Sequence, residues 1–324
     1  MTNEADISEN KIFTDNPGVL EKLLLDHTTH KNIFWATNSY ADRGDGFSFY
    51  DEITVEHITG VNGQIIQPRA IKALSVQTQR SKDMAEVFTP SWICNAQNNL
   101  IDEAWFGRPD VFNVVNEDDH TWQPTEGKIE FPEGKTWKDY VRDNRLEITC
   151  GEAPYLASRY DTVTGEPINP LSKRIGLLDR KLRVVGENTE SSGDWLKWAK
   201  EALKSTYGFE WQGDNLLLAR ETLLYTFCDY YEEKFGTPIP QISLDGVAHI
   251  ISWNLWQMDG LKGVIPGSCH DRTDTQQSLF GDVTTTVTPC EGCAKDDIRR
   301  HNGTYALVKD WGTKKKIRFI DLIK

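Results

Sequence analysis

The nine residues RLEITCGEA at positions 145–153 read as a short apolar strand that runs into a turn of small residues around Gly151. A second strand, TYGFE, follows at 206–210. Between the two strands, apolar residues recur at helical spacing over 174–185 and 195–203. Strands that alternate with helices in this way predict an α/β fold, with a parallel sheet and helices on both of its faces.

The same alternation continues along the chain. Apolar residues over 216–231 predict a long helix, and VAHIISW at 247–253 reads as a third strand. Upstream, a helix is expected from Ser91 to Ala104, because Pro90 precedes its first turn. A short helix over 17–25, short strands within 31–80 and a loop over 107–136 complete the expectation. The predicted domains are a mixed N-terminal region at 1–80, a central domain at 81–265 with a helical insertion at about 155–205, and a C-terminal element at 266–324.

Composition excludes several classes of protein. The chain has 324 residues, 38% hydrophobic and 26% charged, which is ordinary for a globular protein. No window approaches the ~18 consecutive apolar residues of a membrane span. The polar start of the sequence predicts no secretory signal, and six cysteines are too few for a disulfide scaffold. We therefore expect a cytoplasmic protein.

Charge is distributed unevenly. The net charge of −13 argues against a simple nucleic-acid coat protein. Cys290–Lys324, however, holds nine Lys/Arg against five Asp/Glu, a net of +4. This basic end, which includes Lys314, Lys315 and Lys316, is interpreted either as a solvated surface or as a contact for an anionic partner such as phosphates.

Each predicted strand ends in residues suited to a ligand. In parallel sheets, ligands bind at the carboxyl ends of the strands. Glu147 lies in the first strand, just before the small-residue turn, and Glu210 ends the second, where folds of this class hydrogen-bond the ribose of an adenosine cofactor. The alternative interpretation is that such an acid only caps a helix or lies on the surface.

The order of these motifs resembles that of S-adenosylmethionine-dependent DNA N6-adenine methyltransferases of restriction–modification systems. EVFTP at 86–90 is similar to that family's upstream cofactor motif, and 147–153 is similar to its glycine-rich turn, with Glu147 in place of Asp and Ala153 in place of Gly. The resemblance implies a class I, Rossmann-like methyltransferase sheet, DNA as a partner, and a specificity or restriction subunit as a further partner. It implies the following contacts to S-adenosylmethionine: Phe88, Thr89, Pro90, Glu147, Thr149, Gly151, Ala153 and Glu210.

The resemblance also implies a catalytic segment. Asn254-Leu255-Trp256-Gln257 lies where the family carries Asn-Pro-Pro-Tyr, so the two prolines and the tyrosine are absent. The Asn254 side-chain oxygen and the Leu255 carbonyl would accept the hydrogens of the adenine amine, and Trp256 or Trp253 would stack on the flipped base. Alternatives are a buried strand end without a catalytic role, a non-catalytic module that binds cofactor or nucleic acid, and methylation of another nucleophile.

A second group of residues predicts a metal site. Cys290 and Cys293 form a C-x2-C pair, which presents two thiolates to one tetrahedral ion. His301 and either Cys269 or His270 would complete the four ligands of a structural zinc ion. The alternative interpretation is a free cysteine pair in a turn.

Overall fold

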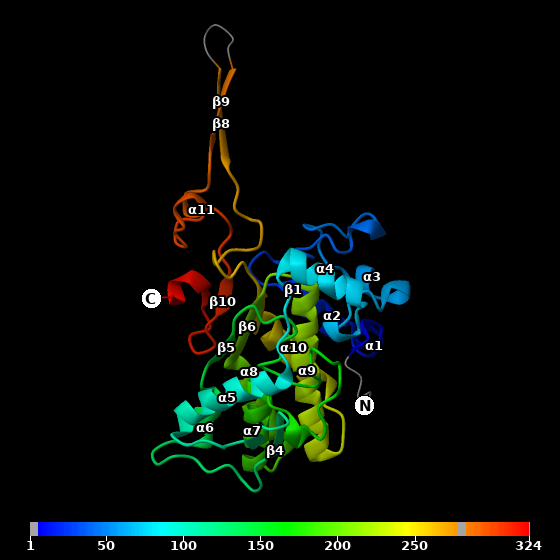
Figure 1. The fold of residues 1–324 in the computed structure, drawn as a ribbon, viewed down its shortest axis with the longest axis vertical. Coiled ribbons are helices and arrows are strands. Elements are labelled where there is room, and N and C mark those ends of the chain that lie inside the picture. The colour runs from blue at the N-terminus through cyan, green and yellow to red at the C-terminus, as the bar shows by residue number, and fades with distance from the viewer. Residues whose placement is uncertain (1–5, 278–282, 324) are drawn as a thin grey trace.

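A computed structural model describes residues 6–277 and 283–323 of the chain (Figure 1). At its centre is a three-stranded parallel sheet in the order β5-β6-β7. The strands are β5 (Arg145–Glu147), β6 (Thr206–Glu210) and β7 (Leu255–Gln257). Glu147 lies opposite Gly208, and Glu210 lies opposite Gln257. The predicted parallel sheet and its first two strands are therefore confirmed, although the described residues form only these three strands in it.

Two helices connect each pair of neighbouring strands. These are α7 (Leu177–Asn188), α8 (Ser192–Lys204), α9 (Gly213–Phe235) and α10 (Gln241–Asn254). In α8, the Ser191 hydroxyl caps the first turn by accepting from the Asp194 N–H. The apolar positions that predicted this helix are buried on one face. Helix α9 ends at Gly236, whose φ of +66° is the usual way for glycine to stop a helix.

The prediction of a strand at 247–253 is wrong. These residues form the second half of α10, which begins after Pro240, and the strand starts only at Leu255. Helix α10 packs against α2, α8 and α9, so most of its surface is covered and its sequence lacks a polar face. A short apolar run cannot be assigned to helix or strand by its period alone when the segment is buried.

The two faces of the sheet are covered differently. Successive strand residues point to opposite faces. Leu255 belongs to the large core shared with the helices, whereas Phe209 and Trp256 pack against Val308 and Phe319 in a second cluster. This second cluster belongs to the hairpin of β10 (Leu307–Lys309) and β11 (Lys316–Arg318). The expected helices on both faces are thus replaced, on the β6–β7 side, by a C-terminal hairpin.

The N-terminal part is more helical than the sequence suggested. The predicted short helix and the helix after Pro90 are confirmed as α2 and α5, but 31–80 holds few strand residues and 107–136 contains a hairpin rather than only a loop. The elements are α1 (Glu9–Asp15), α2 (Pro17–Leu24), β1 (Leu25–Asp26), β2 (Lys31–Asn32), α3 (Val55–Ile58), α4 (Leu74–Met84), α5 (Ser91–Phe106), β3 (Asn113–Asn116), β4 (Thr121–Pro124) and α6 (Trp137–Arg142). Gln257 joins this part to the sheet, because its side-chain amide exchanges two hydrogen bonds with the backbone of Phe34.

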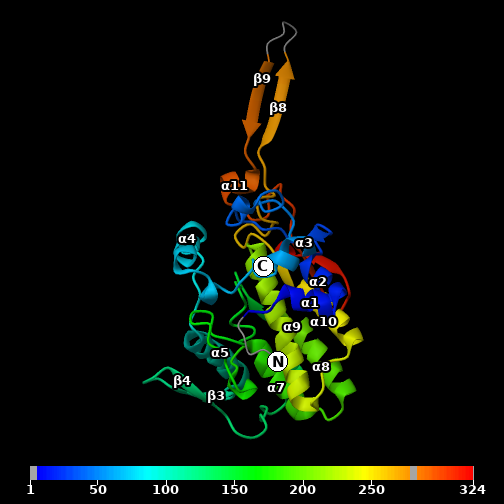
Figure 2. The ribbon, with the colours of Figure 1, turned by 90° about the vertical axis from the view of Figure 1, so that its right-hand side faces the viewer.

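A two-stranded ribbon projects from one end of the molecule (Figures 1 and 2). It consists of β8 (Arg272–Gln277) and β9 (Val283–Thr288), which pair only with each other, and it is followed by α11 (Glu291–Lys295). Over residues 6–277 and 283–323, no helix has both the length and the apolar character needed to cross a membrane.

Two buried carboxyl groups, those of Glu9 in α1 and Glu221 in α9, lie close enough to influence each other electrostatically. Burial raises the pKa of Glu9 to about 8, and nearby Asp6 adds to the rise. Burial and the charge of Glu9 raise the pKa of Glu221 well above its ordinary value. Because these folded-state pKa values exceed those of the unfolded chain, the protonated forms are favoured by folding, and stability falls as pH rises from about 4.5 to about 8.

We therefore expect Glu9→Gln to remove part of this pH dependence. The free energy of unfolding of the wild type should fall by a few kcal/mol, as an order of magnitude, between pH 5 and 8, and that of Glu9→Gln should fall less. Urea unfolding across this pH range measures the difference. Glu21→Gln, at an exposed position of α2, serves as the control and should follow the wild type. Parallel curves for the wild type and Glu9→Gln would contradict the expectation.

Candidate cofactor cleft and metal centre

A cleft of about 940 Å³ opens at the carboxyl ends of β5 and β6. Four segments that are distant in the sequence meet there: the N-terminal segment around residues 36–49, the segment after α4, the turn after β5 and the end of β6. Its lining comprises residues 36–39, 49, 79, 83–89, 147–151, 154–155, 210–212 and 215. Of the predicted cofactor residues, Phe88, Thr89, Glu147, Thr149, Gly151 and Glu210 line the cleft. Pro90 instead caps α5, and Ala153 is buried behind the turn.

Glu210 joins the ends of the two strands. Its Oε2 accepts a hydrogen bond of 2.8 Å from the Gly151 N–H, and its Oε1 accepts one of 3.2 Å from the Gln212 N–H. Burial raises the pKa of Glu210, and these backbone donors counteract the rise. The carboxylate is thus held at the cleft wall by the backbone and retains acceptor capacity for a ligand hydroxyl.

The turn after β5 has a strained backbone. Thr149, Gly151 and Ala153 have φ values of +46°, +53° and +62°, in the left-handed region that disfavours side chains. A Cβ on Gly151 would lie 3.2 Å from the Phe88 ring, so glycine allows the segment after α4 to cross closely over the turn. The Glu147 carboxyl group accepts hydrogen bonds from the N–H groups of Tyr155 and Leu156 and so connects the two ends of the turn.

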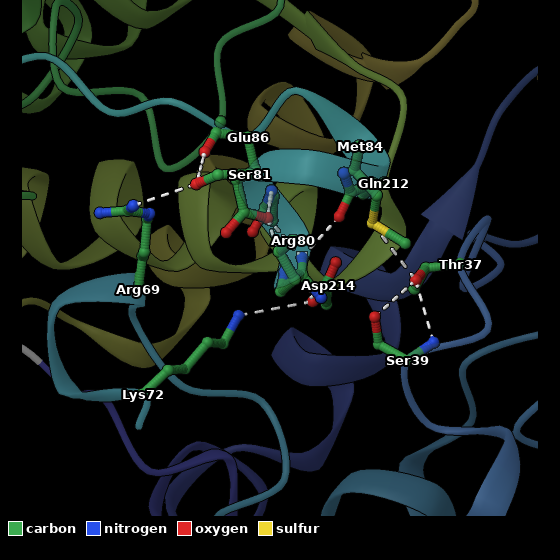
Figure 3. A network of polar contacts seen from close by, with 12 residues as sticks. Thr37, Ser39, Arg69, Lys72, Arg80, Ser81, Met84, Glu86, Gln212 and Asp214 are labelled. Atoms are coloured by element: carbon green, nitrogen blue, oxygen red, sulfur yellow. Dashed lines mark hydrogen bonds and ion pairs between the residues drawn. The ribbon is translucent and has the colours of Figure 1, made fainter. Parts of the chain in front are cut away.

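A buried ionic network holds the segment after α4 in place (Figure 3). The Arg80 guanidinium lies 2.6 Å from the Glu86 carboxylate and 2.9 Å from that of Asp214 on α9. Asp214 also accepts from the Tyr40 hydroxyl at 2.8 Å, and Lys72 Nζ lies 3.6 Å away. Sequence reasoning missed this network, because Arg80 and Asp214 are 134 residues apart and no local motif connects them.

The lining of the cleft is acidic. Four carboxylates line it, from Asp83, Glu86, Glu147 and Glu210, and no Lys or Arg of the described chain does. Glu86 Oε1 and Asn215 Oδ1 are also buried without a hydrogen-bond partner in the described structure. A wide cleft lined by carboxyl groups is suited to a ligand that brings hydrogen-bond donors. Burial raises the pKa of Glu147 and of Glu210, which favours their neutral forms, and Glu86 is paired with Arg80, so the lining offers hydrogen-bond acceptors rather than a strong negative charge.

The structure does not bring Asn254, Leu255 and Trp256 to the cleft, which corrects the expected catalytic arrangement. The Asn254 amide donates to the carbonyls of Leu203 and Thr206 at 2.8 and 3.0 Å, and its oxygen accepts from Trp311. The Leu255 carbonyl accepts from Arg220, and Trp256 is buried in the second cluster. Asn254 ends α10 and Leu255 and Trp256 begin β7, whereas the cleft lies at the carboxyl ends of the strands. The geometry agrees with the alternative of a buried segment without a catalytic role, although the segment is the junction of α10 and β7 and not the end of a strand.

Cys269, Cys290, Cys293 and His301 form a compact group, and their ligand atoms all lie within 4.8 Å of one another. His301 Nδ1 lies 3.5, 3.7 and 3.6 Å from the sulfurs of Cys269, Cys290 and Cys293. With ordinary zinc bond lengths, a tetrahedral site separates sulfur from nitrogen by about 3.6 Å. The group could therefore bind a metal ion such as zinc. The choice between Cys269 and His270 is settled by geometry, because the His270 ring lies outside the group, next to the Ser268 carbonyl.

The metal group lies at the base of the ribbon. Cys269 precedes β8 and Cys290 follows β9, so one ion would hold both ends of the ribbon together. Gly267, two residues before Cys269, lies so close to Tyr50 that a Cβ there would be 2.7 Å from the phenol oxygen. Tyr50 is the neighbour of Phe49 in the cleft wall.

No known protein family, no curated protein and no solved structure matches this chain.

Proposed function

We propose that the cleft binds S-adenosylmethionine and that the protein transfers its methyl group to N6 of adenine in DNA, as a methylase subunit of a restriction–modification system. One observation carries the proposal: three segments that resemble cofactor motifs of this family line one acidic cleft at the carboxyl end of a parallel sheet. The fit is chemical as well as positional, since S-adenosylmethionine carries a sulfonium and an ammonium group, and the described residues that line the cleft include four carboxyl groups and no Lys or Arg.

Different residues of the cleft contact different parts of the cofactor in this proposal. Glu210, fixed by the Gly151 and Gln212 N–H groups, accepts hydrogen bonds from the ribose hydroxyls. Glu86 and Asn215, which hydrogen-bond to each other in the cleft wall, support the side of the cleft that would face the cofactor. Phe88 and Tyr155 supply aromatic surface in the cleft wall. When bound, the cofactor supplies an electrophilic methyl group.

The metal group belongs to the same proposal as a structural zinc site. Four protein ligands leave no open coordination position, so the ion would stabilise the ribbon base and take no part in chemistry. Reduced cysteines fit the cytoplasmic setting that the sequence predicts. DNA and a specificity subunit are the proposed partners.

A non-catalytic module that binds the cofactor is the second candidate. It is favoured by the occupied acceptors of Asn254 and Leu255, which leave the adenine amine without the groups expected to orient it. Incubation of the protein with radiolabelled S-adenosylmethionine and unmethylated DNA separates the two. Labelled N6-methyladenine supports the methyltransferase, whereas cofactor binding without any transfer supports the module.

Both candidates require Glu210. We expect Glu210→Ala to weaken S-adenosylmethionine binding at least ~10-fold in calorimetry, because a charge-assisted hydrogen bond is worth about 1.5–3 kcal/mol. Glu210→Gln, which keeps the size of the side chain, should also bind more weakly.

The matched control is Glu152→Ala. Glu152 is a buried carboxyl group of the same turn, but it faces Arg69 and Tyr160 and does not line the cleft. The Glu152→Ala variant should bind the cofactor as tightly as the wild type, although its free energy of unfolding should be lower. If Glu210→Ala, folded by circular dichroism, binds as tightly as the wild type, Glu210 is not part of the site.

A further inference from the structure

Five lysines gather at the end of the sheet opposite the cleft. We call Lys200, Lys204, Lys309, Lys314 and Lys316 the lysine patch. Lys204 ends α8 just before the amino end of β6. The hairpin of the patch meets it there, because Trp311, in the turn between β10 and β11, donates to Asn254, the residue just before β7. The patch is therefore separated from the cleft by the length of the strands.

Two tryptophans lie under three of the five ammonium groups. Lys309 Nζ lies 4.3 Å from the centre of the Trp311 ring, and Lys204 Nζ lies 5.7 Å from the same ring. Lys309 and Lys316 also each lie 5.3 Å from the Trp253 ring. Cation–π contacts of this kind fix the direction of side chains that would otherwise move freely.

The arrangement is electrostatically unfavourable in the free protein. Lys309 and Lys316 are directly opposite in the β10–β11 hairpin, where like charges destabilise a strand pair. Burial, and then the charges of Lys204, Lys316 and Lys314, lower the pKa of Lys309. His249, at 3.3 Å from Lys309 Nζ, adds no negative charge.

The acidic side chains nearby do not neutralise the patch. Glu201 pairs with Lys204 but is shared with Arg142. Asp310 accepts from Gly312 and Thr313 of its own turn, and Asp245 pairs with Lys22. Among the residues that the structure describes, Lys200, Lys309, Lys314 and Lys316 form no ion pair. A positive surface thus persists on a protein with a net charge of −13.

We propose that the lysine patch binds the phosphate backbone of a DNA duplex, away from the cleft. The inference rests on the proposed function, which identifies the polyanion as DNA. It adds the surface of the protein that contacts the DNA backbone. Lysines from a helix and a hairpin, spread over two indole rings, can contact several phosphates of one polymer at once, whereas a single inorganic phosphate would leave most of them unpaired. Such contacts give affinity without base specificity.

The test uses the triple variant Lys309→Gln, Lys314→Gln and Lys316→Gln in the full chain. Binding of a labelled duplex is followed by fluorescence anisotropy between about 50 and 200 mM salt. The slope of log K against log salt should become shallower by about 2.7 for three lost phosphate contacts, and affinity at the lower salt should fall at least ~10-fold. The control triple, Lys11→Gln, Lys128→Gln and Lys173→Gln, changes the net charge equally and should keep the wild-type slope.

Calorimetry with S-adenosylmethionine separates this inference from the proposed function. Loss of duplex binding in the patch variant with unchanged cofactor affinity supports the patch. If the wild type binds no cofactor while the slope still depends on the three lysines, the proposed function fails and the patch stands. Equal slopes for the wild type and both triples would overturn the patch. Binding to phosphatidylglycerol vesicles but to no duplex would overturn it in favour of a membrane surface.

Discussion

Gly292→Ala should abolish metal binding and release the ribbon while leaving the central sheet folded. Gly292 lies inside the C-x2-C pair, and a Cβ there would lie 2.6 Å from both the backbone nitrogen and Nδ1 of His301. The contact pushes the His301 ring away from the three cysteine sulfurs, so the four ligands can no longer surround one metal ion. Structural zinc contributes about 10–16 kcal/mol to the folding of small zinc-finger peptides, which is more than an isolated hairpin can replace.

Elemental analysis and limited proteolysis measure this outcome. Wild-type protein should contain close to one zinc per chain, and chelation should make it as sensitive to protease between Gly267 and His301 as Gly292→Ala. Gly193→Ala, in α8 where a Cβ meets nothing within 4 Å, is the control and should retain the metal. Zinc-free wild type with a resistant ribbon base would contradict the metal site. A Gly292→Ala variant that binds zinc normally would contradict the close contact between position 292 and His301.

The sequence predicted best where a local pattern carries its own physical signal. Helical spacing located α8 and α9, and Pro90 marked the start of α5. The C-x2-C spacing and His301 identified three members of the metal group, because these ligands are close in the chain. The fourth, Cys269 rather than His270, depends on how the chain returns after the ribbon, and no local feature of the sequence specifies that return.

The features that could not be predicted depend on contacts between residues that are distant in the sequence. The apolar run at 247–253 fits a strand or a buried helix equally, and contacts with α2, α8 and α9 determine that it is a helix. Asn254 had the residue type of a catalytic amide, but its role depends on the carbonyls of Leu203 and Thr206, which only the fold brings close. The cleft was anticipated from its motifs, whereas the ionic network behind it was not.

That network gives the second large expected effect. Arg80→Met should lower the free energy of unfolding by about 3–5 kcal/mol, because it leaves the buried carboxylates of Glu86 and Asp214 without their shared cation. Urea unfolding measures the loss. Arg318→Met removes the same charge from a solvent-exposed pair with Asp321 and should cost far less stability, because water screens exposed ion pairs. Equal costs at the two positions would contradict the role of the network.

The double variant Arg80→Met/Asp214→Asn tests how the network acts on the cleft. Removing one carboxylate together with the cation should recover part of the lost stability, so the two changes should be less costly together than their sum. Cofactor affinity should not recover in parallel, because Glu86 begins the segment that passes over the turn at Gly151 and loses its anchor in both variants. Stability and S-adenosylmethionine affinity that recover together would mean that Arg80 only stabilises the fold, whereas affinity that stays low would identify it as a positioning residue for the cleft.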